Sequence, residues 1–94
     1  MAGDGPLFVA IDAGTTGARA CAVGLDGRLV REARRPYSTA APQPGWAEQD
    51  ANDWREMALD ALADLMTALG DGATIEAIGL TGQCPTIAPI DASG

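Results

Sequence analysis

The fold is decided by Phe8-Val-Ala-Ile-Asp-Ala-Gly-Thr-Thr-Gly-Ala-Arg19. Its apolar part, Leu7 to Ile11, is short and is followed by turn-forming residues, which predicts a strand buried on both faces. Two glycines, Gly14 and Gly17, come next, and they allow a tight turn whose backbone N–H groups approach a bound anion. The stretch therefore predicts a buried strand that leads into an anion-binding loop.

The side chains of this loop suit a nucleotide phosphate. Thr15 and Thr16 add hydroxyl donors, and Arg19 adds a permanently charged fork that matches phosphate oxygens. An acidic residue, Asp12, is expected beside an anion only when a cation mediates, and Mg²⁺ with phosphate is the commonest such pair. We interpret the loop as a grip for a Mg-nucleotide. The alternative is a hairpin turn that uses glycine and threonine for backbone reasons alone.

Two better-known phosphate loops are excluded by the sequence. The chain contains no lysine, so the Gly-x-x-x-x-Gly-Lys-[Ser/Thr] loop cannot occur. The first strand is not followed by Gly-x-Gly-x-x-Gly, so the dinucleotide-binding fingerprint is absent too.

Size and charge narrow the functional classes. The 94 residues suffice for one small domain with a modest core. The formal net charge of -7 argues against a protein that binds the phosphate backbone of nucleic acids. The positive charges are all arginines, and we expect Arg31, Arg34 and Arg35 to lie on a solvated edge strand whose charges discourage edge-to-edge pairing.

The sequence predicts a cytoplasmic protein. It shows no basic and apolar signal peptide, and no apolar run long enough to span a bilayer, so a membrane is not expected as a partner. Cys21 and Cys84 are far apart and lack metal-ligand spacing. Without an export signal they are expected to be reduced thiols.

Apolar runs and turn residues divide the chain into short elements. Residues 1–6 are expected to form a loose leader, residues 36–45 a loop, and residues 91–94 a turn. Asp26-Gly27 signals a two-residue hairpin turn. Strands are predicted at Leu7–Ile11, Ala18–Val23, Leu29–Arg35, Ile75–Leu80 and, as the start of a further strand, Ile87–Ile90.

One long helix is predicted between the third and fourth strands. Asp50 suits its N-cap, Asp53 lies near the positive end of its dipole, and Gly70 suits its end. Apolar residues recur on it at helical spacing: Trp54, Met57, Ala58, Ala61, Leu62, Leu65, Met66 and Leu69. A hairpin, a helix and another strand describe an α/β fold with a mixed sheet and one crossover. The segment 81–85 leaves the fourth strand, where open α/β sheets tend to place ligands.

Three segments together resemble a known family. They are Ile11 to Arg19, the run Pro44-Gly45-Trp46-Ala47-Glu48-Gln49-Asp50 with Asp53-Trp54 behind it, and Ile78-Gly79-Leu80-Thr81-Gly82-Gln83. In order and spacing they resemble the N-terminus of the FGGY-family carbohydrate kinases, which include xylulokinases and glycerol kinases. The resemblance covers the chain from about Leu7 onward.

The resemblance implies a fold and an activity. The fold would be part of the ribonuclease H-like, or actin-like ATPase, fold, with residues 7–94 forming the start of the N-terminal kinase domain. The activity would be ATP-dependent phosphorylation of a sugar or polyol hydroxyl, with ATP and Mg²⁺ as cofactors. The resemblance assigns Asp12 to Mg²⁺ through water, and it assigns the terminal phosphates of ATP to Gly14, Thr15, Thr16 and Arg19.

The resemblance also places residues beside the sugar. Gln83, Cys84 and Pro85 fall where the family has sugar-facing residues. Glycerol kinases carry Arg-Glu at the last two positions and typical xylulokinases carry Met-His, whereas Cys84 and Pro85 offer almost no side-chain hydrogen bonding. This weakens glycerol strongly and xylulose moderately as the substrate, and it leaves a ketose, a polyol or another pentulose open, with a pentulose favoured.

Three further residues of the second segment, Trp46, Glu48 and Asp50, are expected to be mainly architectural. The resemblance places the general-base aspartate, the second phosphate loop and the adenosine pocket downstream of this chain, so the isolated chain is predicted to be inactive. A homodimer of the full-length protein stays open. The alternatives are an actin-like nucleotide-binding module without small-molecule kinase activity, and an inactive truncated product.

Overall fold

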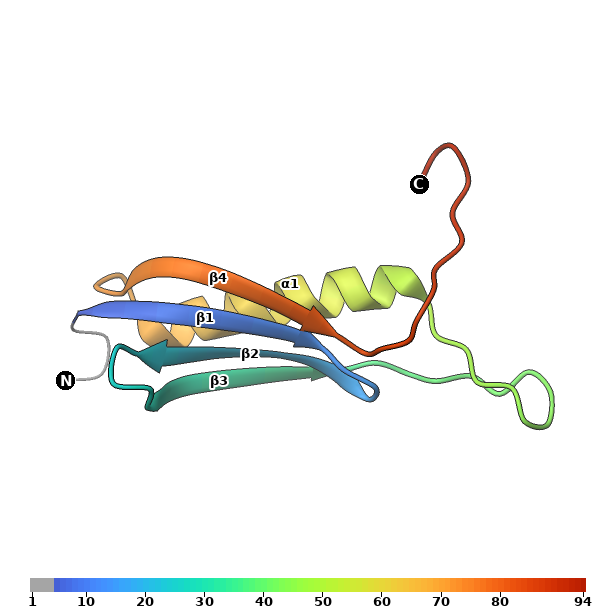
Figure 1. The fold of residues 1–94 in the computed structure, drawn as a ribbon, viewed down its shortest axis with the longest axis horizontal. Helices are drawn as coiled ribbons and strands as arrows, with labels where there is room; N and C mark the ends of the chain where they lie inside the picture. Colours follow the sequence, from blue (N-terminus) through green and yellow to red (C-terminus); the bar gives the residue numbers. More distant parts are fainter. Residues whose placement is uncertain (1–4) are drawn as a thin grey trace.

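The computed structural model describes residues 5–94 as a four-stranded sheet with one helix against it (Figure 1). In chain order the elements are β1 (Pro6–Ala13), β2 (Gly17–Gly24), β3 (Leu29–Pro36), α1 (Ala51–Leu69) and β4 (Thr74–Gly82). The strands are arranged in the order β3-β2-β1-β4.

The sheet is mixed, as predicted. β1 pairs antiparallel with β2, and β2 pairs antiparallel with β3. β4 pairs parallel with β1 because α1 carries the chain back along the sheet before β4 begins. The predicted hairpin at Asp26-Gly27 is present, but its loop has three residues, 25–27, rather than two: the N–H of Gly24 donates to the carbonyl of Arg28 at 2.9 Å, and only Gly27, with φ 84°, has a positive φ.

The ends of the chain differ from the sequence prediction in two places. β1 begins at Pro6, inside the expected leader 1–6, and residues 1–4 of that leader lie outside the described residues. The prediction of a strand at Ile87–Ile90 is wrong, since no strand follows β4 within residues 83–94. A strand needs a neighbour for its backbone groups, and none of the described residues pairs with this segment. The turn at 91–94 is confirmed by a bond from Gly94 N–H to the Asp91 carbonyl at 3.1 Å.

The helix begins and ends where its capping residues predict. The Asp50 carboxylate accepts a hydrogen bond from the N–H of Asn52 at 2.9 Å. At the other end, Gly70 has φ 82°, and its N–H donates to the carbonyl of Met66 at 3.1 Å. Gly70 adopts this left-handed conformation without the steric cost that a side chain would add.

The core lies between α1 and the sheet. β2 presents a row of small residues to the helix (Ala18, Ala20 and Ala22), and these allow α1 to approach closely. Ala61 and Leu65 of the helix are fully buried against this row. Leu7, Val9 and Ile11 of β1 complete the buried cluster. The predicted apolar stripe is therefore the packing face of α1, except for Met66, which is exposed. None of the described helices has a stretch long and apolar enough to cross a membrane.

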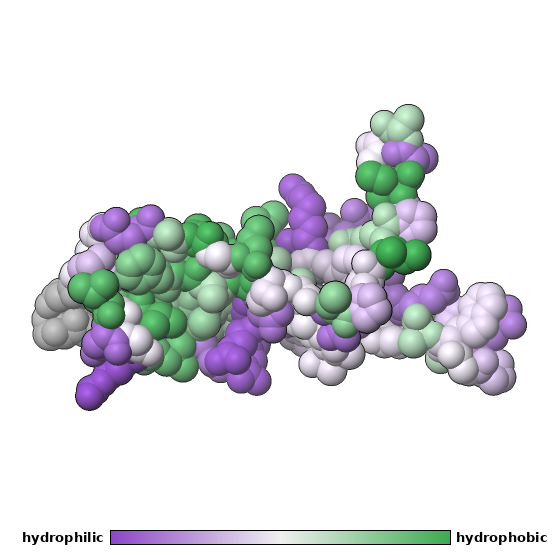
Figure 2. Space-filling view, viewed as in Figure 1, coloured by the Kyte–Doolittle hydropathy of each residue, from purple (hydrophilic) through white to green (hydrophobic). Residues whose placement is uncertain are grey.

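The helix covers only part of the sheet. It packs on β2 and β3 and reaches β1, whereas of the β4 side chains only Ile75 packs against the core cluster. Ile78 and Leu80 lie on the helix side of β4, in register with Val9 and Ile11, yet they are 52% and 79% exposed. Figure 2 shows the opposite face of the sheet, where apolar surface extends over the strands and a strongly polar patch lies beside it.

An ion pair fastens the edge strand to the helix. The Arg35 guanidinium donates two hydrogen bonds to the Asp64 carboxylate, from Nε at 2.6 Å and from a terminal nitrogen at 3.0 Å. The interpretation of Arg35 as a solvated edge-strand charge is therefore wrong. Arg35 pairs with Ala18 on β2, and paired residues point to the same face of a sheet. Because Ala18 is buried under the helix, the Arg35 side chain lies on the helix side of β3. This bond, together with the charge of Arg35, lowers the pKa of the Asp64 carboxyl.

This ion pair predicts a pH-dependent stability. The folded-state pKa of Asp64 lies below its unfolded value of about 3.9, so the stabilisation is present above that pH and is lost as the pH falls through the folded-state pKa. We expect Asp64→Asn to lower Tm at neutral pH and to match the wild type in strong acid. The effect should be modest because both side chains are 43% exposed to solvent. Asp71→Asn, in the turn after α1, is the control. A Tm difference that stays constant across a pH series would contradict the pairing.

Candidate functional site

The first loop and the end of β4 meet at one edge of the sheet. β1 and β4 are parallel, so the loop after β1 and the segment after β4 leave the sheet on the same side. The N–H of Gln83 donates to the carbonyl of Ala13 at 2.9 Å and joins the two segments. The structure thus brings together the predicted phosphate loop and the first of the predicted sugar-facing residues.

The carbonyl groups of this loop are all hydrogen-bonded within the protein. Each carbonyl from Ala13 to Gly17 accepts a hydrogen bond. In chain order the donors are Gln83 N–H (2.9 Å), the Tyr37 hydroxyl, Gln49 Nε2 (2.7 Å), Tyr37 N–H (3.2 Å) and Gly14 N–H (3.0 Å). The loop is therefore held by donors from three segments that are distant in sequence.

This arrangement turns two N–H groups outward. In a trans peptide the C=O and the following N–H point in opposite directions. The Tyr37 hydroxyl holds the carbonyl of Gly14, and Gln49 holds that of Thr15, so the N–H groups of Thr15 and Thr16 face away from these partners. Within residues 5–94 neither N–H is paired with an acceptor. Adjacent outward-facing N–H groups suit an anion, and the loop thereby fits a phosphate.

A hollow of about 360 Å³ lies beside the loop, and Asp12 lines it together with Thr15 and Thr16. Asp12 is partly buried. Burial of the Tyr37 phenol raises the pKa of Tyr37, and the negative charge of Asp12 raises it further. Residues 5–94 contain no cluster of three or more acidic, cysteine or histidine side chains that would form a metal cage. Mg²⁺ in nucleotide sites is held by one or two carboxylates, phosphate oxygens and waters, and Asp12 provides one such carboxylate.

Arg19 already has a carboxylate partner. One of its terminal nitrogens lies 2.6 Å from Glu32, and Arg34 donates to the other oxygen of Glu32 at 2.9 Å. The hydrogen bond from Arg19 is the largest cause of the lowered pKa of Glu32. Arg19 and Arg34 both line the hollow beside the loop. The sequence predicts Arg34 only on a solvated edge and does not reveal its place beside the loop. The β2–β3 register puts Arg34 opposite Arg19, which brings it there.

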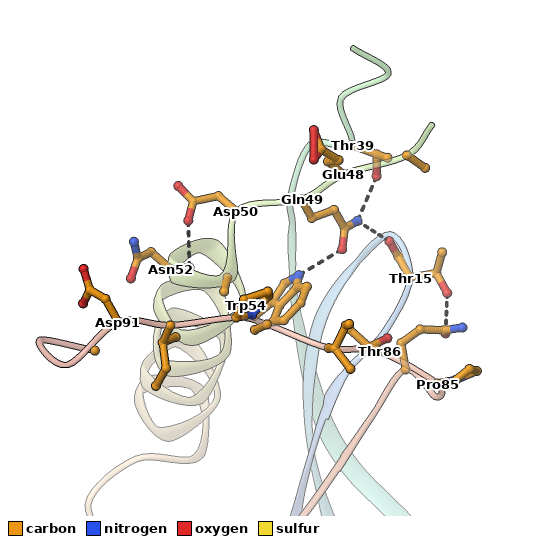
Figure 3. A pocket seen from close by; sticks show the side chains of 18 of the residues that line it. Thr15, Thr39, Glu48, Gln49, Asp50, Asn52, Trp54, Pro85, Thr86 and Asp91 are labelled. Atoms are coloured by element: carbon orange, nitrogen blue, oxygen red, sulfur yellow. Dashed lines mark hydrogen bonds between the residues drawn. The ribbon is translucent and has the colours of Figure 1, made fainter. Parts of the chain in front are cut away.

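Thr15 and Gln83 are joined by their side chains. The hydroxyl of Thr15 donates to Oε1 of Gln83 at 2.5 Å, so in this structure it contacts the segment after β4 (Figure 3). Gln83 and Pro85 line an open groove of about 810 Å³ beside the start of α1. Cys84 is exposed and does not line this groove, so the structure brings only two of the three predicted sugar-facing residues to it.

Of the three residues expected to be mainly architectural, Glu48 and Asp50 fix local structure, whereas the side chain of Trp46 is half exposed. Glu48 pairs its backbone with Ala40 in both directions, at 2.7 and 2.8 Å, and Asp50 caps α1. Trp46 is 53% exposed and only its N–H is fixed, at 2.9 Å from the Gln43 carbonyl. Sequence reasoning missed Gln49 and Tyr37 as partners of the loop. Gln49 stood within the recognised segment, but its target is 34 residues away in sequence.

Comparison with known proteins now identifies the family. The model of the FGGY family of carbohydrate kinases, N-terminal domain, matches residues 7–94. The chain belongs to this family. It is 39% identical over 87 residues to glycerol kinase from Bdellovibrio bacteriovorus, which covers 92% of this chain and 18% of that protein. It is 41% identical over 78 residues to glycerol kinase from Haloferax volcanii, with 82% and 15% covered.

Solved structures agree with this assignment. Xylulose kinase from Rhodospirillum rubrum superposes with a TM-score of 0.88 at 35% identity, and the match covers 94% of this chain and 18% of that one. Plasmodium falciparum glycerol kinase with ADP, at 18% identity and a TM-score of 0.75, shares the fold over 83% of this chain. The predicted actin-like ATPase fold is confirmed for this partial domain. The chain spans less than a fifth of the length of these relatives.

The close approach of β3 predicts which loop glycine is sterically required. A Cβ on Gly17 would lie 2.6 Å from the carbonyl oxygen of Arg35 and 2.9 Å from Cα of Pro36. We expect Gly17→Ala to lower the free energy of unfolding by about 1–3 kcal/mol, measured by urea denaturation, because backbone atoms must move. Gly72→Ala is the matched control, since a Cβ there meets nothing within 4 Å. Equal stability of the two variants would contradict the β2–β3 register.

Proposed function

We propose that this chain is the N-terminal part of an ATP-dependent carbohydrate kinase and that it supplies the first phosphate loop and one side of the acceptor site. The observation that carries the proposal is the orientation of the loop. Its carbonyls are tied inward, and the N–H groups of Thr15 and Thr16 face outward without a partner in residues 5–94. The family, whose members are carbohydrate kinases, supplies the reaction class.

In this function each loop residue has one task. The N–H groups of Thr15 and Thr16 bind the terminal phosphate oxygens of ATP. Arg19 gives a further phosphate contact. To do so, its guanidinium must bind Glu32 and the phosphate together, or break its ion pair with Glu32. Asp12 holds Mg²⁺ through water. The ion, when bound, neutralises the charge that develops on the phosphates during transfer.

The acceptor site depends mainly on Gln83. Its Oε1 accepts from Thr15, so its NH₂ group is left to donate to a hydroxyl or carbonyl of the acceptor. Cys84 and Pro85 supply shape but almost no hydrogen bonds. We therefore favour a ketose, in particular a pentulose, over glycerol, although relatives named as glycerol kinases and as xylulose kinases both match the chain.

The rest of the active site is proposed to come from sequence beyond these residues. The general-base aspartate, the second phosphate loop and the adenosine pocket have no counterpart among the described residues. We place the complete enzyme in the cytoplasm, as a monomer or a homodimer. An actin-like module without kinase activity is disfavoured because the matching family is one of carbohydrate kinases.

A substrate panel with the complete kinase tests the function. We expect ATP-dependent phosphorylation, with a kcat/KM at least about tenfold higher for a ketose than for glycerol, because a site without donors for glycerol discriminates against it. Asp12→Ala should abolish turnover while circular dichroism stays unchanged, since Asp12 acts on Mg²⁺ and lies outside the core cluster. The proposal fails if no sugar or polyol is phosphorylated. Glycerol as the best acceptor would overturn the ketose preference alone.

The 94-residue chain by itself is expected to bind ATP at millimolar affinity or worse and to phosphorylate nothing. The phosphate groups of ATP would be held by one loop that faces solvent. Charges are screened there, and ordering the ligand costs entropy. Calorimetric titration with MgATP measures this directly, with the complete kinase as the positive control. Micromolar binding by the 94-residue chain would show that the missing parts are dispensable.

A further inference from the structure

We infer that Gln49 is a positioning residue that aims the Thr16 N–H at the phosphate of ATP, an inference that rests on the proposed function. Gln49 lies in the loop before α1 and does not belong to the phosphate loop. Its Nε2 donates to the carbonyl of Thr15 at 2.7 Å, and through that planar peptide it sets the direction of the N–H of Thr16.

The orientation of the Gln49 amide is fixed by chemistry. The indole N–H of Trp54 can only donate, and it lies 2.9 Å from Oε1 of Gln49 (Figure 3). The carbonyl of Thr15 can only accept, so the NH₂ group must face it. The same NH₂ group donates to Thr39 Oγ1 at 2.8 Å. Three hydrogen bonds hold the Gln49 side chain. Rotation of its amide by 180° would break the bonds to Trp54 and to the Thr15 carbonyl, because the first partner can only donate and the second can only accept.

The anchor of this relay is the first turn of α1. Trp54 is on that turn and is partly buried, and Asp50, next to Gln49, caps the same turn through Asn52 at 2.9 Å. The helix is packed on the sheet by its buried residues Ala61 and Leu65. The phosphate loop is thus connected to the buried core through Gln49 and Trp54. These residues lie too far from the loop in sequence for a local turn to make this connection.

The bond at Gln49 is separate from the contact with the acceptor segment. Thr15 is held at its carbonyl by Gln49 and at its hydroxyl by Gln83. Gln49 also lines the groove that Gln83 and Pro85 line. Its NH₂ group is already used within the protein, by the Thr15 carbonyl and by Thr39, so it has no free donor for an acceptor hydroxyl. We therefore expect a change at Gln49 to affect ATP far more than the acceptor.

Two variants of the complete kinase separate the donor from the rest of the side chain. Gln49→Glu keeps an acceptor for Trp54 but replaces the NH₂ donor by a carboxylate oxygen that repels the Thr15 carbonyl. Gln49→Met keeps the length and removes both functions. Gln43→Glu is the matched control, because Gln43 is exposed and its side chain makes no hydrogen bond within residues 5–94. Trp54→Phe, which removes only the donor that orients the amide, should show a smaller loss.

The expected result is a loss confined to the phosphate. At pH 8, kcat/KM for ATP should fall about tenfold to a hundredfold in Gln49→Glu and Gln49→Met, less than or equal to the loss of a whole oxyanion donor. The acceptor KM should stay within about twofold of the wild type. Equilibrium binding should weaken for a non-hydrolysable MgATP analogue but not for adenosine, which has no phosphate.

A pH series gives the decisive readout. A carboxyl held against a carbonyl has a raised pKa, and once protonated it can donate to that carbonyl again. The kcat/KM of Gln49→Glu for ATP, relative to the wild type, should therefore recover as the pH falls toward about 5.5, while that of Gln49→Met should not. A purely structural role for the side chain would produce no such rescue.

Each outcome separates the two proposals. Wild-type ATP kinetics in Gln49→Glu, equal losses for adenosine and the ATP analogue, or the same pH profile in both variants would overturn the positioning role and leave the kinase function standing. Absence of phosphorylation by the wild-type enzyme would overturn the function itself. In that case the binding titrations still decide whether Gln49 governs affinity for the phosphates.

Discussion

The parallel pairing of β1 with β4 is the constraint on which the rest of this structure depends. Parallel strands cannot be joined by a tight turn, so the chain must cross over, and it does so through α1. The crossover is stable because α1 packs on the alanine row of β2. The same pairing brings the loop after Ala13 beside Gln83, since both strands end at one edge. The loop after β1 and the segment after β4, which we propose bind the nucleotide and the acceptor, are therefore neighbours as a result of strand direction.

The loop after β1 is shaped mainly by donors that lie outside it. Its carbonyls are held by Tyr37 from the end of β3, by Gln49 before α1 and by Gln83 after β4. A loop of this length could expose either its carbonyls or its N–H groups, and only the latter attract a phosphate. The three distant donors decide this choice. The proposed anion binding is in this sense a property of the packed domain, and this is why residues outside the loop are expected to alter ATP affinity.

Electrostatics in the hollow beside the loop runs against the charge of the chain. The protein has a formal net charge of -7, yet Arg19 and Arg34 line this hollow and share one carboxylate, that of Glu32. With Asp12 counted as well, these two guanidinium groups face two carboxylates, so their charges balance in an otherwise acidic chain. In the proposed function, Glu32 also restrains Arg19 before a phosphate binds. A charged side chain that is already oriented loses less entropy when it binds, but it must give up part of an existing ion pair.

The sequence by itself determined the four strands, the helix, their order and the family. Apolar runs, the Asp26-Gly27 turn and the caps at Asp50 and Gly70 act over a few residues, so they could be interpreted without a structure. Local patterns failed where the outcome depends on a distant partner. Ile87–Ile90 forms no strand because nothing among the described residues pairs with it, and Arg35 meets Asp64 because the pleat turns it toward the helix. Only the tertiary structure could show that Gln49 and Tyr37 orient the loop, since hydrogen bonds across tens of residues leave no periodic signal in the chain.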